Sequence, residues 1–400
     1  MPPRVRRPSD FVLWLLFILV GAPAIVVPQY SGILTEQTGM AATAGVGCAF
    51  LGIVLVTRRL DFHFIPKGRP SGTSFWILVI AFSVFVYGYL AVTTGLRIRL
   101  VGFADVYDLR DEYREDLASV GGIFGYLITW QGNVMNPLMV VRGIFSRRLT
   151  PIIAGTVGQL LLFSATGFKT IMLSVPALLL VAWLFRRNPN PSGTLLLWIV
   201  SAFSTICVSV DAIVGSQTWT SLFVRRFLLT SGMLTSTYIA FFSEQPKLYL
   251  SHSVLAPWMT YPFQLPYTRQ VGLYVTGDPR TSMNANVIAD GFANAGWLGV
   301  AVACVAVAIV LALVDDASRG LPIAVPATLM LLPTIAMGNS ALLTALLTHG
   351  VALAVVVLAA LPADGWGVTP PKRAPRSARR RARSQNVRIP QMTSSSISRS

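Results

Sequence analysis

Residues 11–28 read FVLWLLFILVGAPAIVVP, and no charged side chain interrupts them. A helix of about 20 apolar residues is long enough to cross a bilayer core of about 30 Å. A basic segment, MPPRVRRPSD, precedes this run, but no small-residue pattern typical of a cleavage site follows it. The stretch is therefore predicted to be a retained signal anchor, the first membrane-spanning helix.

The rest of the chain repeats this apolar pattern. Hydrophobic residues make up 54% of the 400 positions and charged residues 12%, whereas a soluble domain carries roughly 25% charge. Helices are expected because lipid offers no partner for free backbone groups, and we see no alternating strands typical of a membrane barrel. The sequence predicts an all-α polytopic membrane protein with about ten transmembrane helices, over 11–28, 39–57, 73–95, 120–141, 151–165, 170–185, 193–214, 298–314, 321–338 and 341–361.

The distribution of charge orients these helices, because cytoplasmic loops carry an excess of lysine and arginine. With a cytoplasmic N-terminus, most of the 32 basic residues fall inside and most of the 16 acidic residues outside. The net charge of +16 then reflects topology, so nucleic acid is not an expected partner. We expect a polytopic domain over 1–361 and a disordered, basic cytoplasmic tail over 362–400. The tail either touches anionic lipid or docks a cytoplasmic partner.

Two long segments, 96–119 and 215–297, are predicted on the outer face. The first contains VYDLRDEYRED, residues 106–116, whose dense charge suits either a solvated loop or part of a site. In a helical arrangement, Arg110 and Arg114 would form a basic edge beside an acidic one.

The second outer segment, a large loop between helices seven and eight, begins with Thr218–Glu244. This stretch reads as an interfacial amphipathic helix that carries Arg225 and Arg226. The following residues, Lys247–Val275, are rich in aromatic side chains near Arg269. These aromatic side chains form either an ordinary interfacial belt or a platform for sugar rings.

The end of this loop carries a polar stripe. Asn286, Asp290 and Asn294 are spaced by four residues, which places them on one face of a helix that enters the membrane. The stripe is either a polar packing seam or a surface that faces substrate. Gly296 and Gly299 are expected to let another helix approach closely.

Other polar groups interrupt the apolar runs. Asp211, near the outer end of a span, is either a functional group or a side chain that reaches the interface or an arginine. Lys169 follows Gly167 in a short outer turn and is either a phosphate ligand or a solvated lysine. The three cysteines and three histidines show no spacing typical of a metal site. The fourth span carries polar residues expected to face the interior and to line a wet cavity, Gln131, Asn133 and Asn136.

Four motifs follow one another along the chain in a recognisable order: DLRDEY (108–113), TGFKT (166–170), RRFLLTSGMLTSTY (225–238) and NANVIADGFANAGWLGV (284–300). With these motifs and its many spans, the chain resembles bacterial Wzy-type O-antigen polymerases, also called oligosaccharide repeat unit polymerases. The resemblance covers most of the chain except the tail. It implies a fold similar to the membrane glycosyltransferase C type and a relationship to O-antigen ligases.

The resemblance further implies an activity on the outer face of the bacterial cytoplasmic membrane. Such proteins join oligosaccharide units linked to undecaprenyl diphosphate: one glycan leaves its diphosphate and is transferred to a sugar hydroxyl of a second unit. No nucleotide sugar, metal or other cofactor is expected. The implied partners are these lipid-linked oligosaccharides within the lipid bilayer, with a chain-length regulator and a flippase as candidate protein partners.

Without a metal, basic side chains must neutralise the diphosphate. A carboxylate within reach of the acceptor hydroxyl could take its proton. The catalytic candidates are Asp290, Asp211 and Asp108, in that order, and His252 ranks below them. The substrate-binding candidates are Arg226, Arg110, Lys169, Arg280, Arg225, Arg114, Arg269, Asn286, Asn294 and Tyr238.

Three alternatives stay open. Two are enzymes: an O-antigen-ligase-like transferase and a membrane glycosyltransferase that uses polyprenyl-phosphate sugars. The latter resembles proteins with an acidic pair in the first outer loop, where this chain has only Glu36. The non-enzyme alternative is a transporter or flippase of lipid-linked oligosaccharide, although no internal repeat is evident and the polar residues gather on the outer side.

Overall fold

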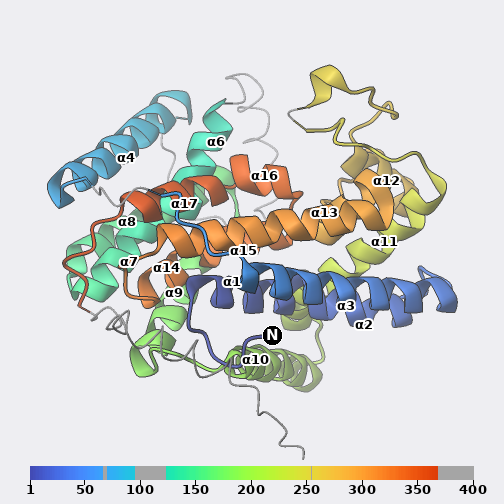
Figure 1. Ribbon diagram of the computed structural model, residues 1–400, viewed down its shortest axis with the longest axis horizontal. Helices are drawn as coiled ribbons and strands as arrows, with labels where there is room; N and C mark the ends of the chain where they lie inside the picture. The colour runs from blue at the N-terminus through green and yellow to red at the C-terminus, as the bar shows by residue number, and fades with distance from the viewer. Residues whose placement is uncertain (66–69, 95–122, 254, 368–400) are drawn as a thin grey trace, which may run out of the picture. The chain divides into compact units, whose positions relative to one another are not determined.

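The computed structural model describes residues 1–65, 70–94, 123–253 and 255–367. These residues form helices joined by connecting segments, and an isolated β-bridge joins Arg4 to Ser192 (Figure 1). The helices are α1 (Pro8–Leu16), η1 (Phe17–Gly21), α2 (Ala22–Tyr30), α3 (Glu36–Arg59), α4 (Gly72–Thr94), α6 (Ile123–Trp130), η2 (Gln131–Met135), α7 (Asn136–Ser146), α8 (Leu149–Thr166), α9 (Lys169–Arg187), α10 (Gly193–Val214), η3 (Thr220–Leu229), α11 (Thr230–Glu244), η4 (Ala256–Trp258), α12 (Tyr267–Thr276), α13 (Val287–Ala317), α14 (Ala324–Leu329), α15 (Leu331–Gly338), α16 (Leu342–Leu347) and α17 (Val351–Ala360).

The described part of the chain contains eight helical ranges that are long and apolar enough to cross a membrane, and each overlaps a predicted span. The prediction of an all-α polytopic membrane protein is therefore confirmed at this coarser level. The predicted span 120–141 corresponds, from 123 onward, to α6, η2 and α7, and 321–338 is divided at Met330 into α14 and α15. The eight ranges are Pro8–Tyr30, Glu36–Arg59, Gly72–Thr93, Leu149–Thr166, Lys169–Arg187, Gly193–Val214, Val287–Ala317 and Leu342–Ala360.

Two π-helical turns each precede a proline. Pro23 lies at the start of α2, directly after η1, and Pro137 at the start of α7, directly after η2. Within a helix, proline donates no backbone hydrogen bond, and its ring clashes with the carbonyl four residues earlier. A wider π turn before the proline relieves that clash while the helix continues. The sequence therefore keeps both long helices continuous despite their prolines.

The core surrounds α13, which packs against α1, α3, α11 and α17. Figure 1 shows α13 running beside α3. α11 packs between α2 and α13 and buries most of its length, with Tyr238 among the largest fully buried side chains. The prediction of an interfacial amphipathic helix over 218–244 is therefore wrong for α11. Its hydroxyl and glycine residues serve close helix packing: Gly232, for example, lies against the backbone of Pro23.

The polar residues of the predicted fourth span face the interior, as expected. Gln131 and Asn136 are 1% and 3% exposed, and Gln131 donates a 2.7 Å hydrogen bond to Oδ1 of Asn136. Asn136 in turn donates to the Tyr87 hydroxyl at 2.8 Å and to Oε1 of Gln159 at 3.2 Å. Asn133 donates to a backbone carbonyl on the turn before α17, at 3.1 Å. These side chains therefore bind other groups of the chain and join α4, α7 and α8 through buried amides.

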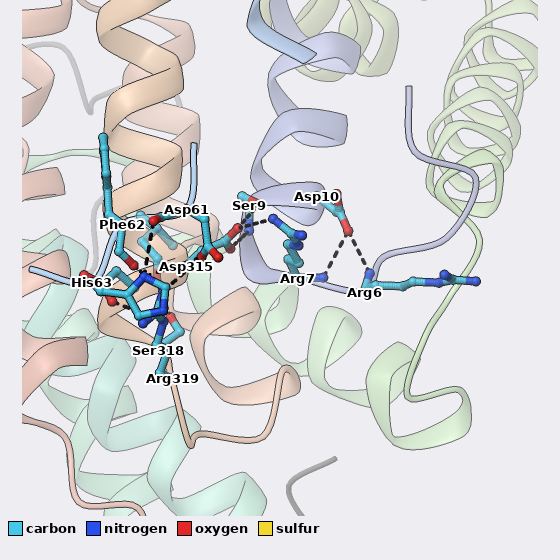
Figure 2. A network of polar contacts seen from close by, with 12 residues as sticks. Arg6, Arg7, Ser9, Asp10, Asp61, Phe62, His63, Asp315, Ser318 and Arg319 are labelled. Carbon is cyan, nitrogen blue, oxygen red and sulfur yellow. Dashed lines mark hydrogen bonds and ion pairs between the residues drawn. The ribbon is translucent and has the colours of Figure 1, made fainter. Parts of the chain in front are cut away.

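Segments that the charge distribution places on one side of the membrane meet in a polar network (Figure 2). Ser9, at the start of α1, donates hydrogen bonds to Asp315 from its amide at 3.0 Å and from its hydroxyl at 2.7 Å. Asp10 accepts from the amides of Arg6 and Arg7, which closes the first turn of α1. The beginning of α1 is thus tied to the end of α13.

The segment after α3 joins the same network. Asp316 accepts hydrogen bonds from the amides of Phe64 and Ile65, at 2.9 and 3.1 Å. Arg319 contacts Asp316 at 3.2 Å and Asp61 at 3.0 Å. The N-terminal segment, the segment after α3 and the end of α13 therefore lie together, as the predicted topology requires of segments on one side.

Candidate functional site

The site begins with a break in α13. Ala295 and Gly296 leave helical geometry, and Gly296 has φ +60° and ψ −144°, a conformation that is essentially restricted to glycine. In an unbroken helix the carbonyls of Ala293 and Asn294 would accept from amides four residues later. Here they accept from the amides of Leu248 and Tyr249, at 2.9 and 3.2 Å. The kink thus binds the loop after α11 to the beginning of α13.

That loop contains a strained turn. Tyr249 and Leu250 have φ of +47° and +65°, in the left-handed region that bulky residues rarely adopt. Asn294 holds the turn, because its Oδ1 accepts a 2.7 Å hydrogen bond from the Leu250 amide. The Nδ2 group of Asn294 donates to the carbonyl of Asp290 at 2.8 Å and to its carboxylate at 3.2 Å. A single buried amide therefore positions both the turn and the carboxylate.

The turn brings a histidine to the carboxylate. Nε2 of His252 lies 3.2 Å from Oδ1 of Asp290, and the two side chains are 10% and 9% exposed. The Tyr267 ring lies against the imidazole, with ring centroids 4.5 Å apart. Nδ1 of His252 is buried and has no hydrogen-bond partner among the described residues. A carboxylate at Nε2 favours a proton on that nitrogen, so Nδ1 is the nitrogen that can accept one.

Asn286, the other polar residue of the predicted stripe, joins the start of α13 to α11. Asn286 is fully buried and precedes the helix, where its Oδ1 accepts from the amides of Ile288 and Ala289. Its Nδ2 donates to Ser231 and Thr235 of α11. The predicted helical stripe is thus wrong for Asn286, which is an N-cap with extended backbone, whereas the next two members of the stripe do lie one turn apart.

Two further predicted site residues also have contacts within the fold. Tyr238 is fully buried, and its hydroxyl donates a 2.7 Å hydrogen bond to the carbonyl of Met283. Asp211 is 4% exposed and accepts from the Ser216 hydroxyl at 2.8 Å. It also accepts from the amides of Trp219 and Thr220, at 3.1 and 2.6 Å. The Asp211 carboxylate therefore secures the start of η3.

The predicted cations of the described region occupy different settings. Arg225 and Arg226 are exposed on η3, and Arg269 is exposed on α12, two positions after the tyrosine that contacts His252. Lys169 is half-buried at the first position of α9, a helix that packs against α7, α8 and α14. Arg280 is paired with an acidic neighbour.

That neighbour is Asp278. Arg280 donates from its backbone amide at 2.9 Å and from its guanidinium at 3.2 and 3.3 Å. The backbone amide and guanidinium of Arg280 hold the pKa of Asp278 below its usual range. The guanidinium is already engaged with this carboxylate, so a phosphate would have to compete for it.

A cation that the sequence did not single out lies beside the kink. Lys247 donates to the carbonyl of Phe242 near the end of α11, and its ammonium lies 4.8 Å from the centre of the Phe292 ring. Burial lowers the pKa of Lys247. A lysine near the end of a helix satisfies carbonyls that lack a partner, so Lys247 connects α11 to α13.

The aromatic segment divides into two groups. Tyr261, Phe263 and Tyr267 pack against the core, whereas Trp258 and Tyr274 are 77% and 54% exposed. Burial, and secondarily the Asp290 carboxylate, raise the pKa of Tyr267. Tyr249, on the strained turn of the same segment, is also 61% exposed. These three exposed residues could present a ring to a sugar without rearrangement.

The close approach expected at Gly296 and Gly299 occurs within one helix. A Cβ on Gly299 would lie 2.0 Å from the carbonyl oxygen of Gly291, so the two glycines let α13 fold sharply on itself. The atoms nearest to Gly299 thus belong to α13 itself and not to a second helix.

Three predicted residues, Asp108, Arg110 and Arg114, lie outside the described residues. Among those described, the structure brings Asp290 and Asn294 together with His252, which the sequence had ranked low. The kink is what joins His252 to Asp290, and the Gly296 that permits it is the available sequence signal. No family model, curated protein or solved structure matches the chain.

Proposed function

We propose that the protein is a glycosyltransferase that joins lipid-diphosphate-linked oligosaccharide units into a surface polysaccharide, with His252 as the general base and Asp290 as its partner. The observation that supports this proposal is the buried contact of 3.2 Å between them, together with the lack of a partner for Nδ1 of His252 among the described residues. A histidine with a carboxylate on one nitrogen and a free second nitrogen is arranged to take a proton from a hydroxyl.

The transfer needs one proton to move and one bond to be exchanged. The acceptor hydroxyl gives its proton to Nδ1 of His252, and its oxygen forms a bond to the anomeric carbon of the donor glycan. The bond between that carbon and the diphosphate oxygen breaks, and the diphosphate leaves with the electron pair. Asp290 stabilises the imidazolium that forms, because opposite charges attract strongly in a buried setting. The imidazolium then returns its proton to the solvent or to the leaving diphosphate.

The leaving diphosphate needs positive charge. Arg269 is the candidate connected to the pair by structure, because Tyr267 on the same helix contacts His252. Arg226 and Arg225, exposed on η3, are the next candidates. Guanidinium groups suit phosphate oxygens because their planar fork donates two parallel hydrogen bonds. In this proposal the basic side chains replace a metal ion as the source of positive charge.

The proposal is tested by deleting the gene and expressing variants in the deletion strain. His252→Gln and Asp290→Asn should each abolish chain elongation and leave single repeat units on the outer face. His63→Gln, a change to an exposed histidine in the segment after α3, should preserve long chains. Immunoblots of membranes establish equal protein levels. Wild-type chain lengths in both site variants would reject the assignment, and repeat units trapped inside the deletion strain would favour a flippase.

A further inference from the structure

Two residues that are consecutive in the sequence, on the turn after α11, have buried side-chain polar atoms without partners among the described residues. These atoms are Oγ of Ser251 and Nδ1 of His252. Ser251 is 3% exposed, and the His252 side chain is 10% exposed. Buried polar groups in folded proteins are almost always paired, so two consecutive unpaired atoms are unusual.

The two atoms without a described partner follow a turn whose backbone is strained. Tyr249 and Leu250 hold left-handed backbone angles immediately before Ser251, and Asn294 binds the Leu250 amide. The next serine differs: the hydroxyl of Ser253 donates a 2.7 Å hydrogen bond to the carbonyl of Leu250. The described part of the fold therefore satisfies the Ser253 hydroxyl but provides no partner for Oγ of Ser251 or Nδ1 of His252. Strain and unpaired polar groups of this kind persist at binding sites because a ligand completes them.

The chemistry of the two atoms identifies what would complete them. With a proton favoured on Nε2 by Asp290, Nδ1 of His252 can only accept a hydrogen bond, whereas the serine hydroxyl can donate one. A single oxygen that donates to the first and accepts from the second belongs to a hydroxyl group or to water, and a sugar acceptor offers such a hydroxyl. Ammonium and guanidinium groups cannot accept, and a carboxylate or phosphate oxygen without a proton cannot donate.

We propose that Ser251 and His252 together bind the acceptor hydroxyl of a sugar, with Ser251 donating to the oxygen while Nδ1 of His252 accepts its proton. This inference rests on the proposed function. Ser251 contributes by orienting the oxygen lone pair, and it is itself not protonated or deprotonated. Both atoms are closed to solvent here, and Tyr267, whose ring lies against the imidazole, is a side chain that would shift when the hydroxyl enters.

The test compares Ser251→Ala with Ser253→Ala in purified full-length protein in nanodiscs. The substrate is the lipid-linked oligosaccharide extracted from the deletion strain. Ser251→Ala should lower kcat/KM about three- to tenfold, the effect expected when one neutral hydrogen bond is lost. Its apparent melting temperature should stay equal or rise, because the change removes a buried unpaired hydroxyl. The loss should be similar at every pH. Ser253→Ala should retain kcat/KM.

The outcomes separate the two proposals. If Ser251→Ala retains full activity while His252→Gln is inactive, the role of Ser251 is wrong and the proposed function stands. If His252→Gln polymerises like the wild type, the proposed function and this inference fall together. If Ser251→Ala melts at a lower temperature, Ser251→Thr decides: activity regained with the hydroxyl supports the inference, and activity still lost overturns it.

Discussion

Gly299 lies directly against Gly291: a Cβ added to Gly299 would stand 2.0 Å from the Gly291 carbonyl oxygen, and one added to Gly291 would stand 2.9 Å from the Gly299 carbonyl oxygen. Both contacts are with backbone atoms, which cannot swing away as a flexible side chain can. The two glycines therefore close the sharp bend in α13 whose released carbonyls hold the turn that carries His252.

Gly299→Ala should therefore destabilise the protein and weaken the proposed glycosyl transfer together. Overpacking of this kind costs about 1–3 kcal/mol, and opening the bend moves Asp290 relative to His252. Gly52→Ala is the matched control, because a Cβ there meets nothing within 4 Å and alanine favours a helix. Thermal unfolding in detergent and the polymerisation assay provide the measurements. Equal melting temperatures for the two variants would show that the bend does not require a glycine at 299.

Asn286→Ala should be among the more destabilising changes of a polar residue. It removes the N-cap of α13 and leaves the side of α11 around Ser231 and Thr235 without its donor. Together these losses should cost about 2–4 kcal/mol. Asn286→Asp retains the capping oxygen but not the donor, so its stability should lie between that of Asn286→Ala and that of the wild type. Asn284 is exposed, so Asn284→Ala should have the stability of the wild type. A small effect at Asn286, within that of Asn284, would contradict the capping role.

Apolar runs and turn residues were enough to predict most of the helical ranges. The run over 11–28 is a helix from Pro8 to Tyr30, and Gly167 does end α8 with φ +63°. Hydropathy could not show that α11 is buried, because the first half of its buried face, up to Thr237, consists of small and hydroxyl residues that also suit an exposed helix. Its burial depends on partners far away in the sequence, such as Pro23 against Gly232.

The site was predicted less completely, for a similar reason. The four-residue spacing of Asp290 and Asn294 correctly placed them on one helical face, where they share a hydrogen bond. His252 was ranked low because its neighbours in sequence say nothing of a carboxylate. Its position depends on backbone bonds from Leu248 and Tyr249 to a broken helix, and helical periodicity cannot reveal a break.

The partly buried Tyr267 should make the protein sensitive to alkali. Its pKa is raised by burial, so the unfolded chain ionises this phenol near pH 10 while the folded chain keeps it neutral. The stability that the neutral phenol contributes is fully present below about pH 10 and is lost as the pH rises further. Tyr267→Phe should therefore lose less stability than the wild type between pH 9 and pH 11. Thermal unfolding across this range measures it, with Tyr274→Phe as the exposed control. Parallel curves for all three proteins would argue against the burial effect.

Cysteine labelling should place the polar network of Figure 2 and the aromatic segment on opposite sides of the membrane. The His63 side chain is 66% exposed, and Trp258 as a whole residue is 77% exposed. Cys48 is an exposed native thiol and has to be replaced first. Because basic loops stay inside, a membrane-impermeant maleimide should label Trp258→Cys in intact cells. It should reach His63→Cys only after permeabilisation.

The parent variant Cys48→Ser should remain unlabelled in both conditions, since Cys207 and Cys304 are buried. The reverse labelling pattern would invert the topology and place His252 and Asp290 on the cytoplasmic side, where a transfer on the outer face is impossible. Labelling of both positions from the same side would instead mean that an even number of crossings separates them. In that case one of the interrupted helices, such as α6 to α7, would be assigned wrongly as a span.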